Sequence, residues 1–285
     1  MADSRTSTAA GQPKVAAAPP WRDGRARRRV AAGLLAVLLS APAPVRSAAA
    51  VTVDLELVLA VDVSSSISRR EYQLQMQGLA QAFRSREVIE TIVNFAPRGV
   101  AVSLFQWGGV GEHATMVPWL LVMDAAGAET VAAAIDRSLR LGENSGTALG
   151  EAIRIATEMF EASGYEGARR VIDVSGDGHA NVGIAPSDAR AAALAAGITV
   201  NGLVILNEEP ELDRYYSAHV IGGEGAFLID ATDFEDFARA IRAKLVREIG
   251  GDRLVEAPSE DGGAGPVLPL RPGPEMLASR SDLGN

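Results

Sequence analysis

Between residues 51 and about 250, short apolar runs rich in β-branched residues alternate with amphipathic or alanine-rich stretches. This alternation is typical of repeated β-α units around a mostly parallel sheet. The apolar run at residues 55–61 is continuous enough to be buried on both faces, which indicates a central strand. Asp54 and Glu56 lie at its start, where we expect a strand still to be near solvent. The sequence therefore predicts an α/β fold, doubly wound, with helices on both faces of the sheet.

The other elements follow from periodicity and turn residues. Two strands, at 100–107 and 113–120, are joined by a short glycine-containing segment that suits an antiparallel hairpin, so one edge strand should run against the others. Further strands are expected at 170–175, 198–206 and 226–230. A first helix is expected at 69–83, and its extension to residue 95 stays open. The remaining helices are expected at 125–139, 147–161, 187–196 with Ser187 as N-cap, 212–220 and 234–249.

Segments outside this region suggest a three-part organisation: a leader at 1–50, the α/β domain at 51–250 and a disordered tail, rich in Pro and Gly, at 251–285. In the leader, a basic run precedes about ten apolar residues and then small residues, the layout of a secretory signal peptide. This apolar stretch is short for a stable transmembrane span. We therefore expect an exported protein, periplasmic or secreted. A cytosolic protein with an alanine-rich leader is the alternative, and a loose twin-arginine signal or a start codon placed too early also stays open.

Composition limits the chemistry that the chain can perform. The formal net charge of −9 argues against nucleic acid as the main partner, because nucleic acid rewards a basic face. The chain has no cysteine, so it forms no disulfide, thiolate metal site or cysteine nucleophile. Any metal site must therefore use oxygen or histidine ligands.

Oxygen-bearing side chains follow or precede the predicted strands and helices at three places. The first strand ends in the pattern D-x-S-x-S at Asp62, Ser64 and Ser66; Thr147 follows a glycine before a helix; and Asp177 stands between two glycines after a later strand. Ligands of open parallel sheets bind beyond the carboxyl ends of the strands, so these positions are the first to consider. Hydroxyl and carboxylate oxygens without sulfur or paired histidines suit a hard cation, and Mg²⁺ or Mn²⁺ fits the small side chains better than Ca²⁺.

Two aspartates and three neutral hydroxyls would leave a divalent ion short of anionic ligands. A carboxylate from another molecule would complete its shell, so the pattern suits the capture of an exposed Asp or Glu of a partner protein. Each of the three pieces alone is common turn chemistry, and the claim depends on their combination and order.

This combination resembles the metal-ion-dependent adhesion site (MIDAS) of von Willebrand factor A (VWA) domains. The resemblance covers about residues 54–249 and implies metal contact by Asp62, Ser64, Ser66, Thr147 and Asp177, directly or through water. It implies a Rossmann-like VWA fold and a binding module without catalysis. The segments at 172–178 and 220–223 are also similar to a bacterial group of exported VWA-like domains of unknown function.

Other polar residues have simpler interpretations. Asp173 lies inside an apparently buried strand, so it needs hydrogen-bond donors or a positive partner, and we expect a structural role. His179 in a glycine-rich loop is interpreted as solvated. Asn144 and Ser145 border Thr147, where a contribution to the rim of the site and a plain loop role are equally plausible.

Two other classes of function compete with the binding module. A Mg²⁺-dependent phosphoryl-transfer enzyme would need a second acid and a cation that clamps phosphate, and neither lysine, Lys14 nor Lys244, is suitably placed, although an arginine could substitute. A serine hydrolase is disfavoured because Ser175 lacks the G-x-S-x-G elbow. A scaffold whose ion only rigidifies the loops is the second alternative.

Overall fold

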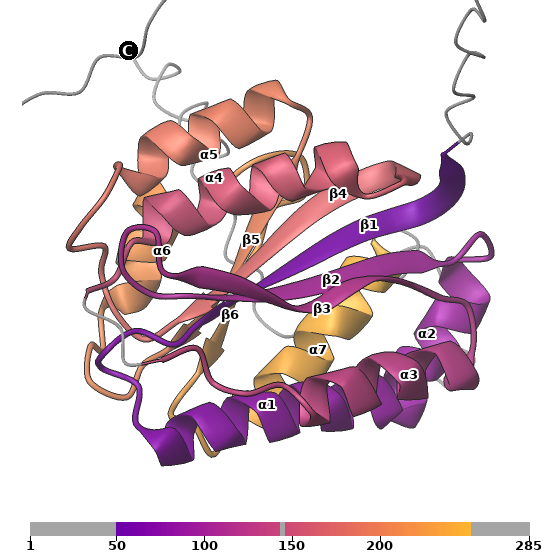
Figure 1. Cartoon of the computed structure of the whole chain (residues 1–285), viewed down its shortest axis with the longest axis horizontal. Helices are drawn as coiled ribbons and strands as arrows, with labels where there is room; N and C mark the ends of the chain where they lie inside the picture. Colours follow the sequence, from indigo (N-terminus) through magenta and orange to yellow (C-terminus); the bar gives the residue numbers. More distant parts are fainter. Residues whose placement is uncertain (1–49, 143–145, 252–285) are drawn as a thin grey trace, which may run out of the picture. The chain divides into compact units, whose positions relative to one another are not determined.

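A six-stranded sheet forms the centre of the described domain (Figure 1). The computed structural model describes residues 50–142 and 146–251. The strands are arranged in the order β3-β2-β1-β4-β5-β6, and β3 alone among them is antiparallel to its neighbour. Their bounds are β1 (Val51–Asp62), β2 (Val100–Trp107), β3 (His113–Val122), β4 (Tyr165–Gly176), β5 (Thr199–Ile205) and β6 (Leu228–Ala231). The predicted mostly parallel sheet with one antiparallel edge strand is confirmed.

Helices cover both faces of this sheet, as the doubly wound prediction requires (Figure 1). One face carries α1 (Arg69–Arg84), α2 (Arg86–Phe95), α3 (Ala125–Asp136) and α7 (Phe237–Gly250). The other carries α4 (Leu149–Met159), the short 3-10 helix η1 (Phe160–Ala162), α5 (Pro186–Ala195) and α6 (Leu212–His219).

The central strand β1 separates two hydrophobic cores. Leu57 and Leu59 belong to the core on the α1 face, whereas Val58 and Ala60 belong to the core on the α4 face. Because successive side chains of a strand point to opposite faces, a strand buried on both faces has no room for a polar alternation. This explains the continuous apolar run of the sequence.

The acidic start of β1 differs from the prediction. The strand begins at Val51, and Asp54 and Glu56 are both buried rather than near solvent. Asp54 accepts hydrogen bonds from the backbone N–H of Arg98 at 2.6 Å and from its guanidinium Nη2 at 2.7 Å, and Glu56 Oε1 accepts from the Gly167 N–H at 2.7 Å. These donors replace water, so the two carboxyl groups can be buried.

Several helix boundaries also differ, and two of these differences have a clear local cause. The first helix ends at Arg84, and the segment up to residue 95 forms a separate helix, because the Ser85 hydroxyl accepts from the Val88 N–H and caps a new N-terminus. Ser187 is not the N-cap of α5. That helix begins one residue earlier at Pro186, whose fixed φ suits the first helical position.

The two edges of the sheet are irregular. Along β3 the register with β2 shifts around Leu104, and Pro118 lies within the strand, where it supplies no backbone N–H. The hydroxyl of Ser103 donates to the Val117 carbonyl at 2.8 Å beside this proline. At the other edge, β6 has only four residues.

Three predictions fall on residues that the structure does not describe: the leader, the tail beyond residue 251, and the rim positions Asn144 and Ser145. Among the residues it does describe, none of the helices combines the length and the apolar character that a membrane span requires.

Candidate metal centre

Two adjacent parallel strands bring Asp62 and Asp177 to the same edge of the sheet. Asp62 is the last residue of β1, and Asp177 follows the last residue of β4. Val61 pairs with Ser175, so the two strands end at the same level. Both aspartates are buried, with exposed fractions of 0% for Asp62 and 4% for Asp177.

The turn after β1 folds its hydroxyl groups toward these carboxylates. Asp62 Oδ1 accepts from the Ser64 N–H at 2.8 Å, which fixes the carboxylate over the turn. The hydroxyl oxygens of Ser64 and Ser66 are 3.3 Å apart, and Ser66 Oγ donates to Asp177 Oδ1 at 2.9 Å. Four of the five predicted ligands, Asp62, Ser64, Ser66 and Asp177, therefore form one hydrogen-bonded group.

Thr147 is positioned by the loop that follows Asp177. Its N–H donates to Asn181 Oδ1 at 2.8 Å, and its carbonyl accepts from the Asn181 N–H at 3.1 Å. Gly146 precedes it with a φ of 95°, and a Cβ there would lie 3.0 Å from Asn181 Oδ1. Sequence analysis missed Asn181, whose only signal is its place in a glycine-rich loop. The loops that carry Thr147 and Asp177 are thus joined directly.

Two further side chains that sequence analysis missed hold the backbone of the metal loop, residues 62–67. Arg140 Nη2 lies 2.6 Å from the Ile67 carbonyl oxygen and 3.2 and 3.3 Å from those of Val63 and Ser64. Gln75 Nε2 donates to the Asp62 carbonyl at 3.3 Å. Neither belongs to a recognisable motif, and Arg140 lies more than 70 residues from the carbonyls it binds.

The electrostatics of this group favour an added cation. Burial, reinforced by the charge of Asp177, raises the pKa of Asp62 to about 7, against the hydrogen bonds from Ser64 and the charge of Arg140. Burial also raises the pKa of Asp177, although Ser66 donates to it. Asp62 Oδ2 is buried without a hydrogen-bond partner among the described residues. An orphaned buried carboxylate oxygen is costly, and a metal ion would satisfy it.

Gly176 leaves the space in which this oxygen lies. A Cβ at that position would be 3.0 Å from Asp62 Oδ2 and 2.5 Å from the Tyr216 hydroxyl. Burial and the charge of Asp62 raise the pKa of Tyr216 well above its usual value, so this hydroxyl stays protonated. Only glycine therefore fits at position 176, where the chain packs directly against Asp62 and Tyr216.

The donor set of the candidate centre contains few charged groups. Across residues 50–142 and 146–251, no group of three or more His, Asp or Glu side chains is suited to holding a metal. The candidate centre offers two carboxylates, and its other oxygens are hydroxyls.

The structure also shows the surroundings of Asp173 and His179. Asp173 is buried, and its Oδ1 lies 3.1 Å from Nζ of the fully buried Lys244, which also pairs with Glu248. Lys244, which is buried in the core, is therefore the positive partner that was expected for Asp173. The exposed His179 pairs with Glu209 and packs on Tyr215 at 4.1 Å between ring centroids.

A family model described as "Protein of unknown function (DUF1194)" matches residues 52–253 of the chain. The chain belongs to this family. The match covers all the elements of the DUF1194 domain except the first residue of β1. No curated protein matches the chain.

Solved structures with a similar fold include adhesive and matrix proteins. Proximal thread matrix protein 1 from the mussel byssus is 17% identical with a TM-score of 0.54, covering 71% of this chain and 50% of its own. Another structure of that protein, described with a zinc-occupied MIDAS motif, is 18% identical with a TM-score of 0.50, covering 71% and 49%. The pilus adhesin SpaC from Lactobacillus rhamnosus GG is 15% identical with a TM-score of 0.51, covering 69% and 30%.

A von Willebrand factor type A structure from Catenulispora acidiphila is 18% identical with a TM-score of 0.47, covering 69% of this chain and 43% of its own. The DUF1194 chain thus spans half or less of the length of these proteins. Together with the sheet order and the antiparallel edge strand, the likeness to the mussel matrix protein, one structure of which is described with a MIDAS motif, confirms the predicted VWA-like fold.

Proposed function

We propose that this domain is an exported binding module that holds Mg²⁺ or Mn²⁺ and captures a carboxylate of a partner protein. The metal ligands would be Asp62, Ser64, Ser66, Thr147 and Asp177, some of them acting through water. When bound, the ion supplies a positive charge that attracts and orients an incoming carboxylate.

The observation that carries this proposal is the hydrogen-bonded group at the ends of β1 and β4. Ser66 and Asp177 lie 111 positions apart in the chain, and Ser66 Oγ donates to Asp177 Oδ1 at 2.9 Å. Asp62 Oδ2 is buried without a hydrogen-bond partner in the described part of the chain. Oxygen donors of this kind favour hard cations. The two carboxylates leave a divalent ion short of anionic ligands, so an anionic ligand from another molecule can complete its coordination shell.

The comparisons support the same class of function without specifying the partner. One similar structure is described with zinc in a MIDAS motif, which supports a divalent cation in this fold. Others are described as a byssal matrix protein and a pilus adhesin, which supports a protein-binding role outside the cytosol. The leader expected at residues 1–50 would direct the chain there.

Among the residues that the structure describes, the one lysine is not suited to a phosphoryl-transfer role. Lys244 is 0% exposed and pairs with two carboxylates in the core, so it is not available to clamp a phosphate. A binding module needs no such group.

Calorimetric titration of Mg²⁺ and Mn²⁺ into the full chain tests the metal site. Asp62→Ala and Asp177→Ala should abolish binding, and Ser66→Ala should weaken it. Ser65→Ala is the matched control, because Ser65 lies in the same loop but is exposed and outside the proposed ligand set. Circular dichroism establishes that each variant folds. Unchanged ion binding in both aspartate variants would refute the site.

A second measurement separates a binding module from a scaffold. Partner capture by the wild-type chain should be lost on chelation and restored by Mg²⁺, and Asp177→Ala should capture nothing in either condition. Chelation that lowers only the melting temperature, with capture intact, would support a structural ion instead.

A further inference from the structure

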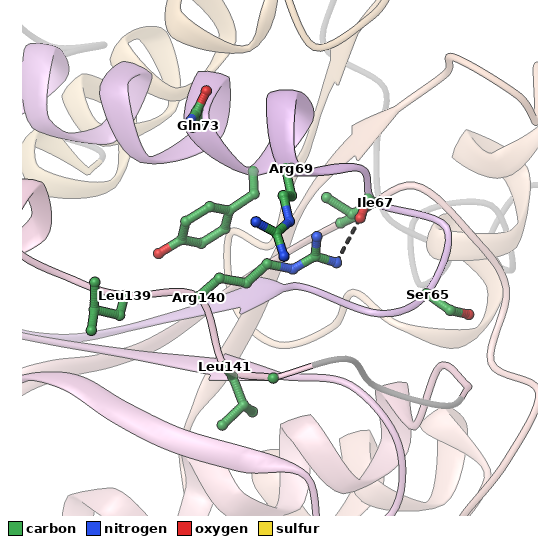
Figure 2. A pocket seen from close by; sticks show the side chains of 9 residues that line it. Ser65, Ile67, Arg69, Gln73, Leu139, Arg140 and Leu141 are labelled. Atoms are coloured by element: carbon green, nitrogen blue, oxygen red, sulfur yellow. Dashed lines mark hydrogen bonds between the residues drawn. The ribbon is translucent and has the colours of Figure 1, made fainter.

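A pocket of about 710 Å³ opens beside the metal loop (Figure 2). It lies between the loop, the first turn of α1 and the segment after α3. Its lining includes Ser65 and Ile67 from the loop, Arg69 and Tyr72 from α1, and Arg140. Ser65 stands in the chain between two of the proposed metal ligands, so the metal loop forms one wall of the pocket.

Two arginines give this pocket a positive charge. Figure 2 shows the guanidinium groups of Arg69 and Arg140 turned toward the same part of the pocket. Neither forms an ion pair with a carboxylate among residues 50–142 and 146–251, whereas the next arginine on the helix, Arg70, pairs with Glu235 at 2.8 Å. Arg140 is tethered by the loop carbonyls, so its position is fixed. Arg69 is exposed.

Two cationic side chains without a carboxylate partner in the described part of the chain suit an anion. Two cations that share a pocket repel one another, and a carboxylate between them would satisfy both with charge-assisted hydrogen bonds. Leu139, 80% exposed, also lines the pocket and offers an apolar contact for the chain that carries such a carboxylate.

We propose that the arginine pocket binds a second carboxylate of the same partner, so that the recognised segment carries two acidic residues. This inference rests on the proposed function, since the first carboxylate is the one that completes the metal shell. Arg69 acts on the ligand directly, and Arg140 both faces the ligand and holds the metal loop.

The test uses short peptides with blocked ends as probes. A diacid series has two Asp residues separated by zero to four Gly, and each member has a mono-acid partner in which the second Asp is Asn. Binding to the full chain is followed by NMR chemical-shift titration, with Mg²⁺ and with chelator. One spacing should bind about fivefold more tightly than its mono-acid partner, which corresponds to roughly 1 kcal/mol, the size of a partly exposed ion pair.

Arg69→Gln should remove this advantage and leave the Mg²⁺-dependent binding of the mono-acid peptide unchanged. Arg70→Gln is the matched control, because it removes a neighbouring charge outside the pocket and should leave the advantage intact. A diacid advantage that is absent at every spacing, or that survives Arg69→Gln, overturns the inference while the proposed function stands. If no peptide requires Mg²⁺ for binding, the proposed function fails. Arg69-dependent binding of a peptide in the absence of metal overturns the coupling of the two sites.

Discussion

The metal-free protein should become more stable when Asp62 is replaced by Asn. Burial and the charge of Asp177 raise the pKa of Asp62 from 3.8 to about 7. Keeping this carboxylate ionised at pH 8 therefore costs the folded state roughly 4 kcal/mol, because a tenfold change in proton affinity is about 1.4 kcal/mol. Asn carries no charge, although its amide group needs an acceptor of its own, which reduces the gain by about 1–2 kcal/mol. A net gain of about 2–3 kcal/mol remains.

The pH dependence has a definite sign. The folded carboxyl keeps its proton to a higher pH than the unfolded chain does, so the metal-free wild type loses stability as the pH rises from about 4 to 7. In chelator at pH 8, Asp62→Asn should melt about 5–10 °C above wild type, and toward pH 4, where only the cost of the amide remains, it should melt slightly below wild type. Mg²⁺ at about a hundred times its Kd should stabilise wild type by about 2.7 kcal/mol and leave the variant unchanged.

Asp54→Asn is the control, since it makes the same substitution in the same strand. Asp54 is also buried, but Arg98 supplies both an N–H and a guanidinium group to it, so removal of its charge should lower the melting temperature. The reasoning is refuted if Asp62→Asn melts below wild type in chelator at pH 8, or if Mg²⁺ stabilises both proteins equally.

Three further predictions concern the core and the metal loops. Lys244→Met should lower the free energy of unfolding in urea by about 3–5 kcal/mol, because Asp173 and Glu248 lose their buried cation; a loss under about 1 kcal/mol would contradict this. Asp173→Asn should flatten the fall in stability between about pH 4 and 7, since burial raises the pKa of Asp173 to about 7; an unchanged slope in a pH series of urea melts would count against it. Asn181→Ala should weaken Mg²⁺ binding about tenfold in calorimetry, because Thr147 loses its anchor; equal affinity would mean that this anchor has no effect on the ion.

The sheet and most of the candidate site could be predicted because their signals are local. A strand buried on both faces has to be continuously apolar, and the run before Asp62 shows this directly. In a parallel sheet, the carboxyl ends of neighbouring strands meet at one edge. The positions of Asp62 and Asp177 after two such strands were therefore sufficient to place them together.

The supporting residues could not be predicted because their partners are distant in the chain. Arg140 binds carbonyls more than 70 residues away, and only tertiary packing brings it there. The same holds for the Tyr216 hydroxyl, which lies against Gly176. The break at Ser85 was missed for a different reason: the apolar periodicity continues across it, and only the cap separates the two helices.

The irregular edges of the sheet have a consequence for how copies of this domain meet other chains. An edge strand that offers an uninterrupted row of amide groups is a template for adding another strand. Pro118 removes one such amide from β3, and the register shifts around Leu104 twist that edge, while β6 is too short to template a long partner. Both edges of the sheet thus discourage intermolecular strand pairing and the fibre growth that follows from it.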